Sequence, residues 1–283
     1  MGSIFNGSQI FSTQNQIFLS KMANSSYILI TGGSSGIGLE TAILFASKGF
    51  HVLITSLDEK ELEIAITQIK ASNNSVSVVG LTSDLSKEGS VQQLYDWAKS
   101  VNPSLDIVIN NAGFGTFGFI DDVDMSRELD MINLMVKNLY VSTRLFLHDM
   151  IRHNKGTIIN ISSISAFQPN PTLATYGASK AFVYQFTRAI NEELKEKKSA
   201  VKCITINPTP VRTNFQNNSG MQKSRLFNTW LTVDAPFVAK EIYRAYAHGI
   251  DTLIPGRFYG FISAINKRLP EGFQIWLAKK HLN

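Results

Sequence analysis

The chain has 283 residues, of which 44% are hydrophobic, and its formal net charge of +5 is modest and scattered along the sequence. These values suit one large domain, and the absence of a basic stripe or of zinc-ligand spacing argues against a nucleic-acid-binding or metal-dependent protein. No apolar run reaches the roughly 18 residues of a membrane span, and the lone Cys203 cannot form an internal disulfide, so a reducing, cytoplasmic compartment is expected.

Residues 1–25 are rich in Asn, Gln, Ser and Phe but lack the basic start and the continuous apolar centre of a signal peptide. We therefore expect a disordered or loosely docked extension over this segment. Met22 is an alternative start, because it lies just before the first predicted strand.

The first apolar run, residues 27–31, is typical of a short buried strand and leads directly into a glycine-rich loop, GGSSGIG, at residues 32–38. A helical pattern follows. Strand, glycine loop and helix in this order predict a dinucleotide site, because glycines permit a tight turn and the helix N-terminus faces the pyrophosphate. The alternative is a plain Gly/Ser turn. The spacing TGxxxGxG also differs from the standard GxGxxG pattern, which indicates another family of nucleotide-binding proteins.

Strands and helices alternate along the rest of the chain, as a parallel sheet requires, and right-handed crossovers place helices on both faces. The sequence therefore predicts a single α/β domain with a doubly wound, Rossmann-like parallel sheet. Strands are expected near residues 27–31, 51–56, 76–81, 105–110, 156–162, 200–206 and 251–254, and helices near residues 36–48, 59–71, 86–99, 124–152, 175–196 and 234–248.

Polar residues follow two of these apolar strands at the points where the strands end. The strand near 105–110 ends in NNAG at residues 110–113, and the strand near 156–162 is followed by Ser163. In open α/β sheets ligands bind at the carboxyl ends of the strands, so these residues are candidates for a binding site. The alternative for Ser163 is an ordinary capping or turn role.

Tyr176 and Lys180 are spaced four residues apart in a predicted helix and therefore share one face of it. An ammonium near the phenol favours the phenolate, so Lys180 is expected to lower the pKa of Tyr176 towards the range where proton transfer is efficient. The alternative is an ordinary surface or packing pair.

Five motifs occur in a fixed order: TGGSSGIG at residues 31–38, NNAG at 110–113, Ser163, YGASK at 176–180 and NPTPVRT at 207–213. Together they resemble the short-chain dehydrogenase/reductase family, in its compact subgroup. The resemblance implies an NAD(P)-dependent oxidoreductase that acts on CH–OH or C=O groups. It also implies an NAD(P)-binding catalytic domain over residues 26–256, with residues 257–283 as a C-terminal helical extension of the same domain.

The resemblance implies a role for each of four catalytic residues. Tyr176 is expected to give a proton to a carbonyl oxygen, or to remove one from an alcohol, as hydride is transferred. Lys180 is expected to lower the pKa of Tyr176 and to hold the nicotinamide ribose, and Ser163 to bind the substrate oxygen. Asn133 matches the family's helix asparagine, which holds a water for proton relay; its alternative is a buried side chain bonded to backbone.

The expected cofactor is NADP or NAD. An acidic residue after the second strand would repel the 2′-phosphate of NADP, whereas this chain has Ser56 followed by Leu57. Electrostatics therefore favours NADP, with Ser35 and Ser56 as neutral donors and Lys60 within reach. The resemblance implies the following cofactor-binding residues: Gly32, Ser34, Ser35, Gly36, Ile37, Gly38, Ser56, Asp84, Leu85, Asn110, Ala112, Gly113, Tyr176, Lys180, Pro208, Val211 and Thr213. Thr209 occupies a position where the family frequently has glycine.

The expected substrate is a small hydrophobic carbonyl or alcohol compound, because apolar residues crowd two segments next to the predicted site. They are Phe114, Phe117 and Phe119 after NNAG, and Phe215, Met221, Leu226, Phe227, Trp230 and Leu231 after Thr213. The alternative is that these side chains pack under a lid or at a subunit contact. The aromatic and basic stretch after residue 256 suits a helix docked over the site, or an interfacial helix in peripheral contact with a membrane.

The helices predicted near 124–152 and 175–196 carry more apolar residues than one buried face requires, so a homodimer or homotetramer is expected. The alternative is that one of the chain's terminal segments covers this surface. A second function also stays open at this point: a catalytically silent NAD(P)-binding regulatory protein that keeps the fold without turnover.

Overall fold

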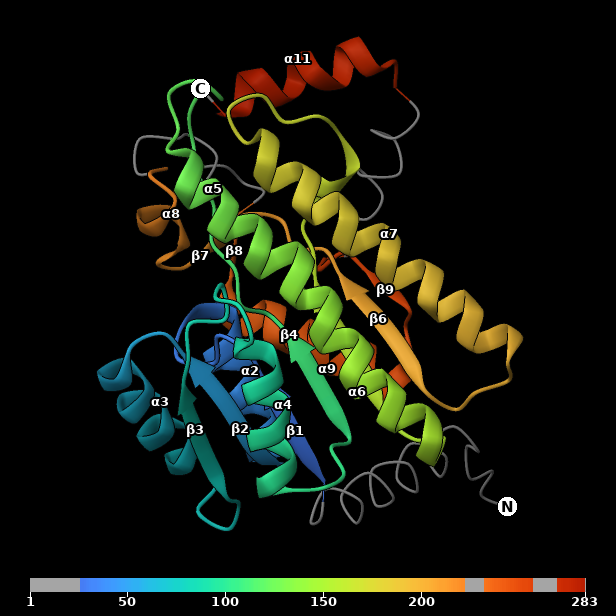
Figure 1. Cartoon of the computed structure of the whole chain (residues 1–283). Helices are drawn as coiled ribbons and strands as arrows, with labels where there is room; N and C mark the ends of the chain where they lie inside the picture. Colours follow the sequence, from blue (N-terminus) through green and yellow to red (C-terminus); the bar gives the residue numbers. More distant parts are fainter. Residues whose placement is uncertain (1–25, 222–231, 257–268, 283) are drawn as a thin grey trace, which may run out of the picture.

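A computed structural model describes residues 26–221, 232–256 and 269–282 of the chain. Its centre is a seven-stranded sheet in the order β3-β2-β1-β4-β5-β6-β9 (Figure 1), in which all neighbouring strands run parallel. The predicted doubly wound sheet is therefore confirmed. The strands are β1 (Tyr27–Ile30), β2 (His51–Ser56), β3 (Val78–Thr82), β4 (Ile107–Asn110), β5 (Thr157–Ile161), β6 (Lys202–Ile206) and β9 (Thr252–Leu253).

The central strands are apolar because helices cover both faces of the sheet and leave no solvated side. Ile28, Leu29 and Ile30 of β1 are fully buried. Ile28 and Ile30 enter the core on one face, and Leu29 enters the core on the other, as the two-residue period of a strand requires. Burial of each such side chain contributes about 1.5–3 kcal/mol.

Helices form an outer layer on each face of the sheet (Figure 1). The helices α2 (Gly36–Ser47), α3 (Glu59–Ser72) and α9 (Ala235–His248) supply the core on one face of the sheet. On the other face lie α4 (Ser90–Val101), α6 (Leu139–His153) and α7 (Ala174–Glu196). The strand β1 pairs with β2 on one side and with β4 on the other. The helices that follow β1 and β4 lie on opposite faces of the sheet, which leaves a crevice between the carboxyl ends of these two strands. Ligands bind in such a crevice in open α/β sheets.

The helix predicted near 124–152 consists of three consecutive segments. These are α5 (Met125–Ile132), the π-helix η1 (Asn133–Asn138) and α6. A wider π-helical turn within an α-helix is rare and often lies at a functional site. The hydrophobic pattern did not reveal it, because this stretch is apolar on most sides of the helix, so a shift of one residue leaves no visible change in period.

Other boundaries and elements also differ from the prediction. The helix predicted near 86–99 begins only at Ser90, because Gly89 before it has a left-handed backbone, with φ of 74°. A separate pair of parallel strands, β7 (Val211–Arg212) and β8 (Val233–Asp234), was not predicted. The remaining short elements are η2 (Ile164–Phe167) and α8 (Phe215–Asn218), and α11 (Glu271–Leu282) lies near the C-terminus.

Several sequence-based expectations lie outside the described residues. These are the extension over 1–25, the alternative start at Met22, the residues Leu226, Phe227, Trp230 and Leu231, and the stretch 257–268. Among the described residues, no helix has both the length and the apolar character needed to cross a membrane.

Candidate active site

The loop between β1 and α2 passes too close to other atoms to carry side chains at its glycines. A Cβ atom on Gly38 would lie 2.1 Å from the Gly32 carbonyl oxygen. Gly36 has a φ of 53°, and a Cβ there would lie 3.0 Å from the methyl group of Thr213. Ser35 is the N-cap of α2, yet its side chain makes no capping bond. The loop thus presents backbone without side chains next to the N-terminus of α2. Binding of a pyrophosphate needs both features.

Two side chains tie the glycine loop to the end of β4. The amide Nδ2 of Asn111 donates to the carbonyl oxygens of Thr31 and Gly32, both at 3.0 Å. The Thr31 Oγ1 in turn accepts from the backbone N–H groups of Asn111 at 3.0 Å and Ala112 at 3.1 Å. These bonds fix the crevice between β1 and β4. Sequence reasoning missed this role of Thr31 and Asn111, although both follow neighbouring strands directly.

Asn110, a predicted cofactor-binding residue, points its side chain into the protein. Its Nδ2 donates to Asn160 Oδ1 at 2.7 Å and to Thr143 Oγ1 at 3.2 Å, and its Oδ1 accepts from Ser142 Oγ at 2.8 Å. The residue is only 5% exposed. This buried network joins β4, β5 and α6, so only the backbone of Asn110 is free to face a ligand.

Ser163, Tyr176 and Lys180 meet at the carboxyl end of β5. The Ser163 side chain hydrogen-bonds to the Tyr176 phenol, and its oxygen also accepts from the Ser165 backbone N–H at 3.1 Å. The Lys180 Nζ lies 5.8 Å from the centre of the Tyr176 ring and donates to the Ile161 carbonyl oxygen at 2.9 Å. The three residues therefore form one compact cluster of a phenol, a hydroxyl and an amine.

The pKa of Tyr176 departs from the sequence-based expectation. Burial of the phenol raises its pKa to about 12, and the hydrogen bond from Ser163 opposes that rise. Burial also lowers the pKa of Lys180 to about 8. The expectation that Lys180 lowers the pKa of Tyr176 is therefore wrong for this structure. The spacing of the two residues predicts attraction between them, but the fold removes both from water, and that burial raises the pKa of the phenol.

The end of β4, the π-helix η1 and Lys180 converge at Gly113. A Cβ on Gly113 would lie 3.0 Å from Met135 Sδ and 3.7 Å from Lys180 Nζ, so a side chain here would fill this space. Asn133 is the first residue of η1 and is partly buried. The Lys180 Nζ donates to the Ile161 carbonyl, and among the described residues no direct hydrogen bond joins Asn133 to Lys180.

The carboxyl ends of β2 and β3 supply the residues predicted for the adenosine half of a nucleotide. Ser56, at the end of β2, is 4% exposed and donates from its Oγ to Ser34 Oγ at 2.9 Å. After β3, Asp84 Oδ1 accepts from the Ser86 backbone N–H at 2.9 Å. The carbonyl of Leu85 accepts from Asn138 Nδ2 at 2.5 Å. Asn138, the last residue of η1, thus positions this loop, a role that sequence reasoning missed.

The segment after β6 closes the site on its other side. The Pro208 carbonyl accepts from the Ile164 N–H at 3.0 Å, which fixes this segment next to Ser163. Val211 is buried and pairs with Val233 in the small sheet. Thr209 is 5% exposed, and its hydroxyl has no hydrogen-bond partner among the described residues. A buried, unpaired hydroxyl is rare, so Thr209 is a candidate contact for a bound molecule.

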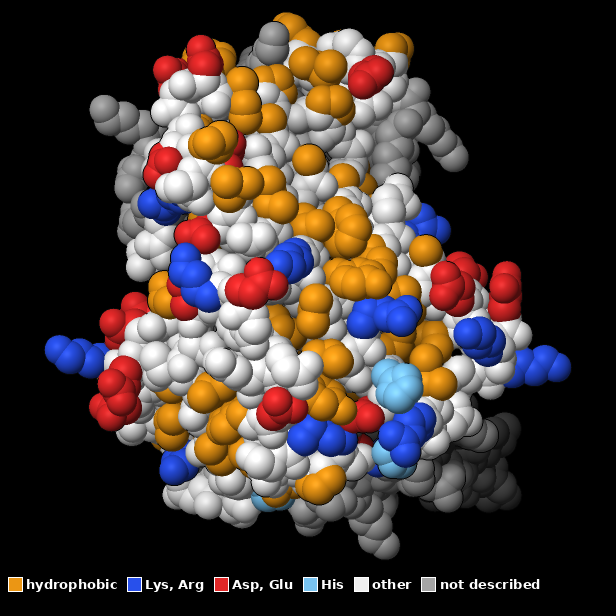
Figure 2. Space-filling model, viewed as in Figure 1, with side chains coloured by type: hydrophobic (Ala, Val, Ile, Leu, Met, Phe, Trp, Pro, Cys, Tyr) orange, Lys and Arg blue, Asp and Glu red, His pale blue; other side chains and the backbone are white. Residues whose placement is uncertain are grey.

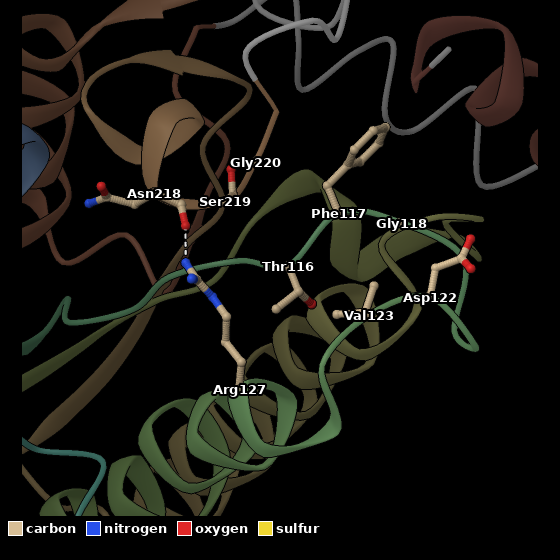
Figure 3. Close-up of a pocket in the computed structure, with 9 residues that line it drawn as sticks. All are labelled: Thr116, Phe117, Gly118, Asp122, Val123, Arg127, Asn218, Ser219 and Gly220. Carbon is tan, nitrogen blue, oxygen red and sulfur yellow. Dashed lines mark hydrogen bonds between the residues drawn. The ribbon is translucent and has the colours of Figure 1, made fainter.

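A cavity of about 480 Å³ lies between the segment after β4 and the segment around α8 (Figure 3). The Arg127 guanidinium spans its two sides, because it donates to the carbonyl oxygen of Asn218 and lies 5.6 Å from the ring centre of Phe114. The cavity is lined by Thr116, Phe117, Gly118, Asp122, Val123, Arg127, Asn218, Ser219 and Gly220.

Apolar side chains connect this cavity to the tyrosine. The Phe215 ring lies 5.6 Å from the Tyr176 ring, and both belong to a cluster with Leu173, Met221 and Phe117. Phe117 also lines the cavity. Of the predicted apolar residues that the structure describes, Phe117, Phe215 and Met221 lie in the cluster with the tyrosine. Phe114 instead lies under the Arg127 guanidinium, and Phe119 is 67% exposed.

Residues 26–224 match the family described as short chain dehydrogenase. The chain belongs to this family. Its members are oxidoreductases that act on alcohol or carbonyl groups with NAD or NADP, so this short-chain dehydrogenase is an enzyme of that class.

Relatives and solved structures agree with this assignment. The chain is 31% identical to "Very-long-chain 3-oxoacyl-CoA reductase" of Rattus norvegicus over 209 residues, which cover 71% of this chain and 65% of the relative. A short-chain dehydrogenase from Sphingobium yanoikuyae in complex with NADPH has a TM-score of 0.75 at 21% identity, with 87% of this chain and 97% of that chain covered. For a short chain dehydrogenase/reductase from Burkholderia phymatum in complex with NAD, the TM-score is 0.77 at 22% identity, with 86% and 93% covered. The two structures support the fold of this short-chain dehydrogenase.

Proposed function

We propose that this short-chain dehydrogenase/reductase transfers a hydride between NAD(P)(H) and a hydrophobic ketone or secondary alcohol, with Tyr176 as the general acid or base. The observation that carries the proposal is the cluster of Tyr176, Ser163 and Lys180 at the end of β5. The cluster lies beside bare backbone at Gly113, where a side chain would fill the space.

When it is bound, the nicotinamide supplies or accepts the hydride. The chain's own residues handle the proton and the charge on the substrate oxygen. The raised pKa of Tyr176 keeps its phenol protonated at neutral pH, which is the form that donates to a carbonyl oxygen. Ser163 donates a hydrogen bond to the same oxygen and stabilises the negative charge that develops there. Lys180 holds the nicotinamide ribose, and Asn133 holds a water that returns protons towards Lys180.

The remaining predicted residues fit a nucleotide along the carboxyl edge of the sheet. Gly36 and Gly38 leave the space and backbone that a pyrophosphate needs. Complexes of the two solved structures with NADPH and with NAD support either nucleotide as the cofactor. We assign its binding to Gly32, Ser34, Ser35, Gly36, Ile37, Gly38, Ser56, Asp84, Leu85, Asn110, Ala112, Gly113, Tyr176, Lys180, Pro208, Val211 and Thr213, with Asn110 acting through its backbone.

The substrate is proposed to enter between Phe117 and Phe215, where apolar side chains connect the 480 Å³ cavity to Tyr176. The rings of Phe117 and Phe215 favour an apolar body with one carbonyl or hydroxyl group. The name of the rat relative, a 3-oxoacyl-CoA reductase, supports a ketone next to a long apolar chain.

Three further expectations stay with this proposal. The catalytic domain extends over residues 26–256, with 257–283 as its helical extension. The buried free thiol of Cys203 supports a reducing, cytoplasmic compartment. The apolar side chains exposed along α5, α6 and α7 support a homo-oligomer.

Titration with NADPH and NADH tests the cofactor site, with intrinsic tryptophan fluorescence as the signal. A panel of apolar ketones and secondary alcohols then tests the chemistry, with nicotinamide absorbance as the measure of turnover. We expect binding of at least one nucleotide and turnover of at least one apolar compound. Binding without turnover across the panel in both directions would instead favour a catalytically silent NAD(P)-binding regulatory protein, and no binding at all would overturn both functions.

A further inference from the structure

The carboxyl end of β2 carries a chain of hydroxyl groups that ends at a carboxylate from another element. Ser56 Oγ donates to Ser34 Oγ at 2.9 Å, and Ser34 Oγ donates to Glu61 Oε2 at 3.4 Å. Ser56 also accepts from the Asp58 N–H at 3.2 Å. Glu61 lies in the first turn of α3, so its carboxylate reaches a strand end that has no acidic residue of its own.

We propose that Glu61 is the residue of this chain that discriminates against the 2′-phosphate of NADP(H) at the adenosine ribose. The inference rests on the proposed function, because it assumes that a nicotinamide dinucleotide lies along this edge of the sheet. It goes beyond that function by assigning nucleotide selectivity to a residue outside the strand end and the glycine loop.

The hydrogen-bond chemistry of the group favours a ribose diol over a phosphate. A carboxylate accepts hydrogen bonds, and the 2′- and 3′-hydroxyls of a ribose can donate them. A phosphate is an acceptor and needs donors instead. In this structure Ser56 donates to Ser34 and Ser34 donates to Glu61, so each hydroxyl would have to give up a hydrogen bond before it could donate to a phosphate.

The charge around Glu61 acts in the same direction. The first turn of α3 and its cap hold three carboxylates, Asp58, Glu59 and Glu61, against one ammonium, Lys60. The Asp58 carboxylate already accepts from the Glu61 N–H at 2.8 Å, so the positive end of α3 is partly neutralised. Within the described residues no ion pair involves Glu61. A phosphate at this place would therefore meet an unpaired negative charge.

The contact between Ser34 and Glu61 also bears on the choice between NADP and NAD, which the sequence left open. The absence of an acidic residue at position 56, together with Lys60 within reach, favoured NADP, because the carboxylate of Glu61 was not counted. Leu57, the next residue, is 72% exposed and offers no positive charge. Once the chain folds, α3 supplies the carboxylate that β2 lacks.

Glu61→Gln tests the proposal, because it keeps the size of the side chain and removes its charge. Glu63→Gln is the matched control: it removes the same charge from an exposed position of the same helix, two residues further on and away from Ser34. Dissociation constants for NADPH and NADH are measured by tryptophan fluorescence for the full-length protein and both variants, and circular dichroism checks the fold.

We expect Glu61→Gln to bind NADPH about tenfold more tightly than the unchanged protein does, and to bind NADH equally or a few fold more weakly. Glu63→Gln should leave the ratio of the two constants unchanged. An unchanged ratio in Glu61→Gln, or an equal shift in Glu63→Gln, would overturn the role of Glu61 while leaving the proposed function in place. If the unchanged protein bound neither nucleotide, the proposed function itself would fall.

Discussion

The Lys180 ammonium lies 5.8 Å from the centre of the Tyr176 ring, and the carbonyl of Ile161 holds it there. The tyrosine and lysine therefore lie on one helix face, as their spacing predicts, but the amine is anchored to the end of β5. Its position is set by the sheet as much as by the helix. Burial shifts both groups towards their uncharged forms, because it raises the pKa of the phenol and lowers the pKa of the amine.

Replacement of Tyr176 by Phe removes the proposed proton donor and little else. The ring keeps its contact with Phe215, so we expect the fold and nucleotide binding to persist. Turnover should fall by about two or more orders of magnitude, the scale of general acid–base catalysis. Steady-state rates on a substrate found in the ketone panel, together with nucleotide titration, measure both quantities. Activity within a few fold of the unchanged enzyme would refute the catalytic assignment.

Lys180 should make stability depend on pH in a particular direction. Its pKa is lowered to about 8 in the fold, whereas a solvated lysine has a pKa of about 10.4. Between these values the unfolded chain holds a proton that the folded chain has released, so the free energy of unfolding rises with pH. We expect Lys180→Met to be more stable than the unchanged protein near pH 7, and to lose about 3 kcal/mol of that advantage by pH 10.5.

Urea unfolding of both proteins at several pH values between 7 and 10.5 measures this difference. The comparison is necessary because the buried Cys203 thiol, whose pKa is raised to about 12, acts in the opposite direction at alkaline pH and affects both proteins equally. A stability difference that does not change with pH would mean that Lys180 does not titrate in this range.

Thr209 offers a test of the segment after β6. Its buried hydroxyl lacks a hydrogen-bond partner among the described residues, so Thr209→Val should stabilise the free protein by about 1 kcal/mol. If the hydroxyl contacts the bound nucleotide, the same substitution should weaken nucleotide binding severalfold. Thermal unfolding with and without nucleotide measures both effects. Stabilisation by nucleotide that is as large in Thr209→Val as in the unchanged protein would exclude the contact.

Much of the fold could be predicted from the sequence because its strongest signals are local. Each apolar run between turns became a strand of the sheet, and the order of motifs placed Ser163, Tyr176 and the glycine loop along one edge. Element ends were less predictable, as the late start of α4 after Gly89 illustrates.

The remaining features depend on contacts between distant residues or on burial. Ser34 and Glu61 are 27 residues apart, and Asn138 reaches Leu85 across 53 residues. No pattern within either segment indicates such a partner. The pKa of Tyr176 was predicted in the wrong direction for a related reason, since the depth of burial around a phenol is set by the whole fold.

Apolar side chains remain exposed along the outer face of α5, α6 and α7. Leu129, Ile132, Tyr140 and Phe182 are between 36% and 51% exposed. Phe182 stacks on Phe186, and Phe186 also contacts Tyr140, with ring centres 5.3 and 5.4 Å apart. Figure 2 shows hydrophobic side chains gathered over the middle of this face. A second copy of the same helices, related by a two-fold axis, would bury these rings.

We therefore expect the protein to form a dimer or tetramer through these helices, and Phe182→Glu to dissociate it, because a charge buried in such a contact would have no partner. Light scattering of the full-length protein and the variant measures this. Ile64→Glu, at an exposed apolar position on α3, is the matched control and should leave the assembly unchanged. A full-length protein that is monomeric, and stays so when it begins at Met22, would contradict the contact. Association only after that truncation would instead mean that the N-terminal segment covers the helices.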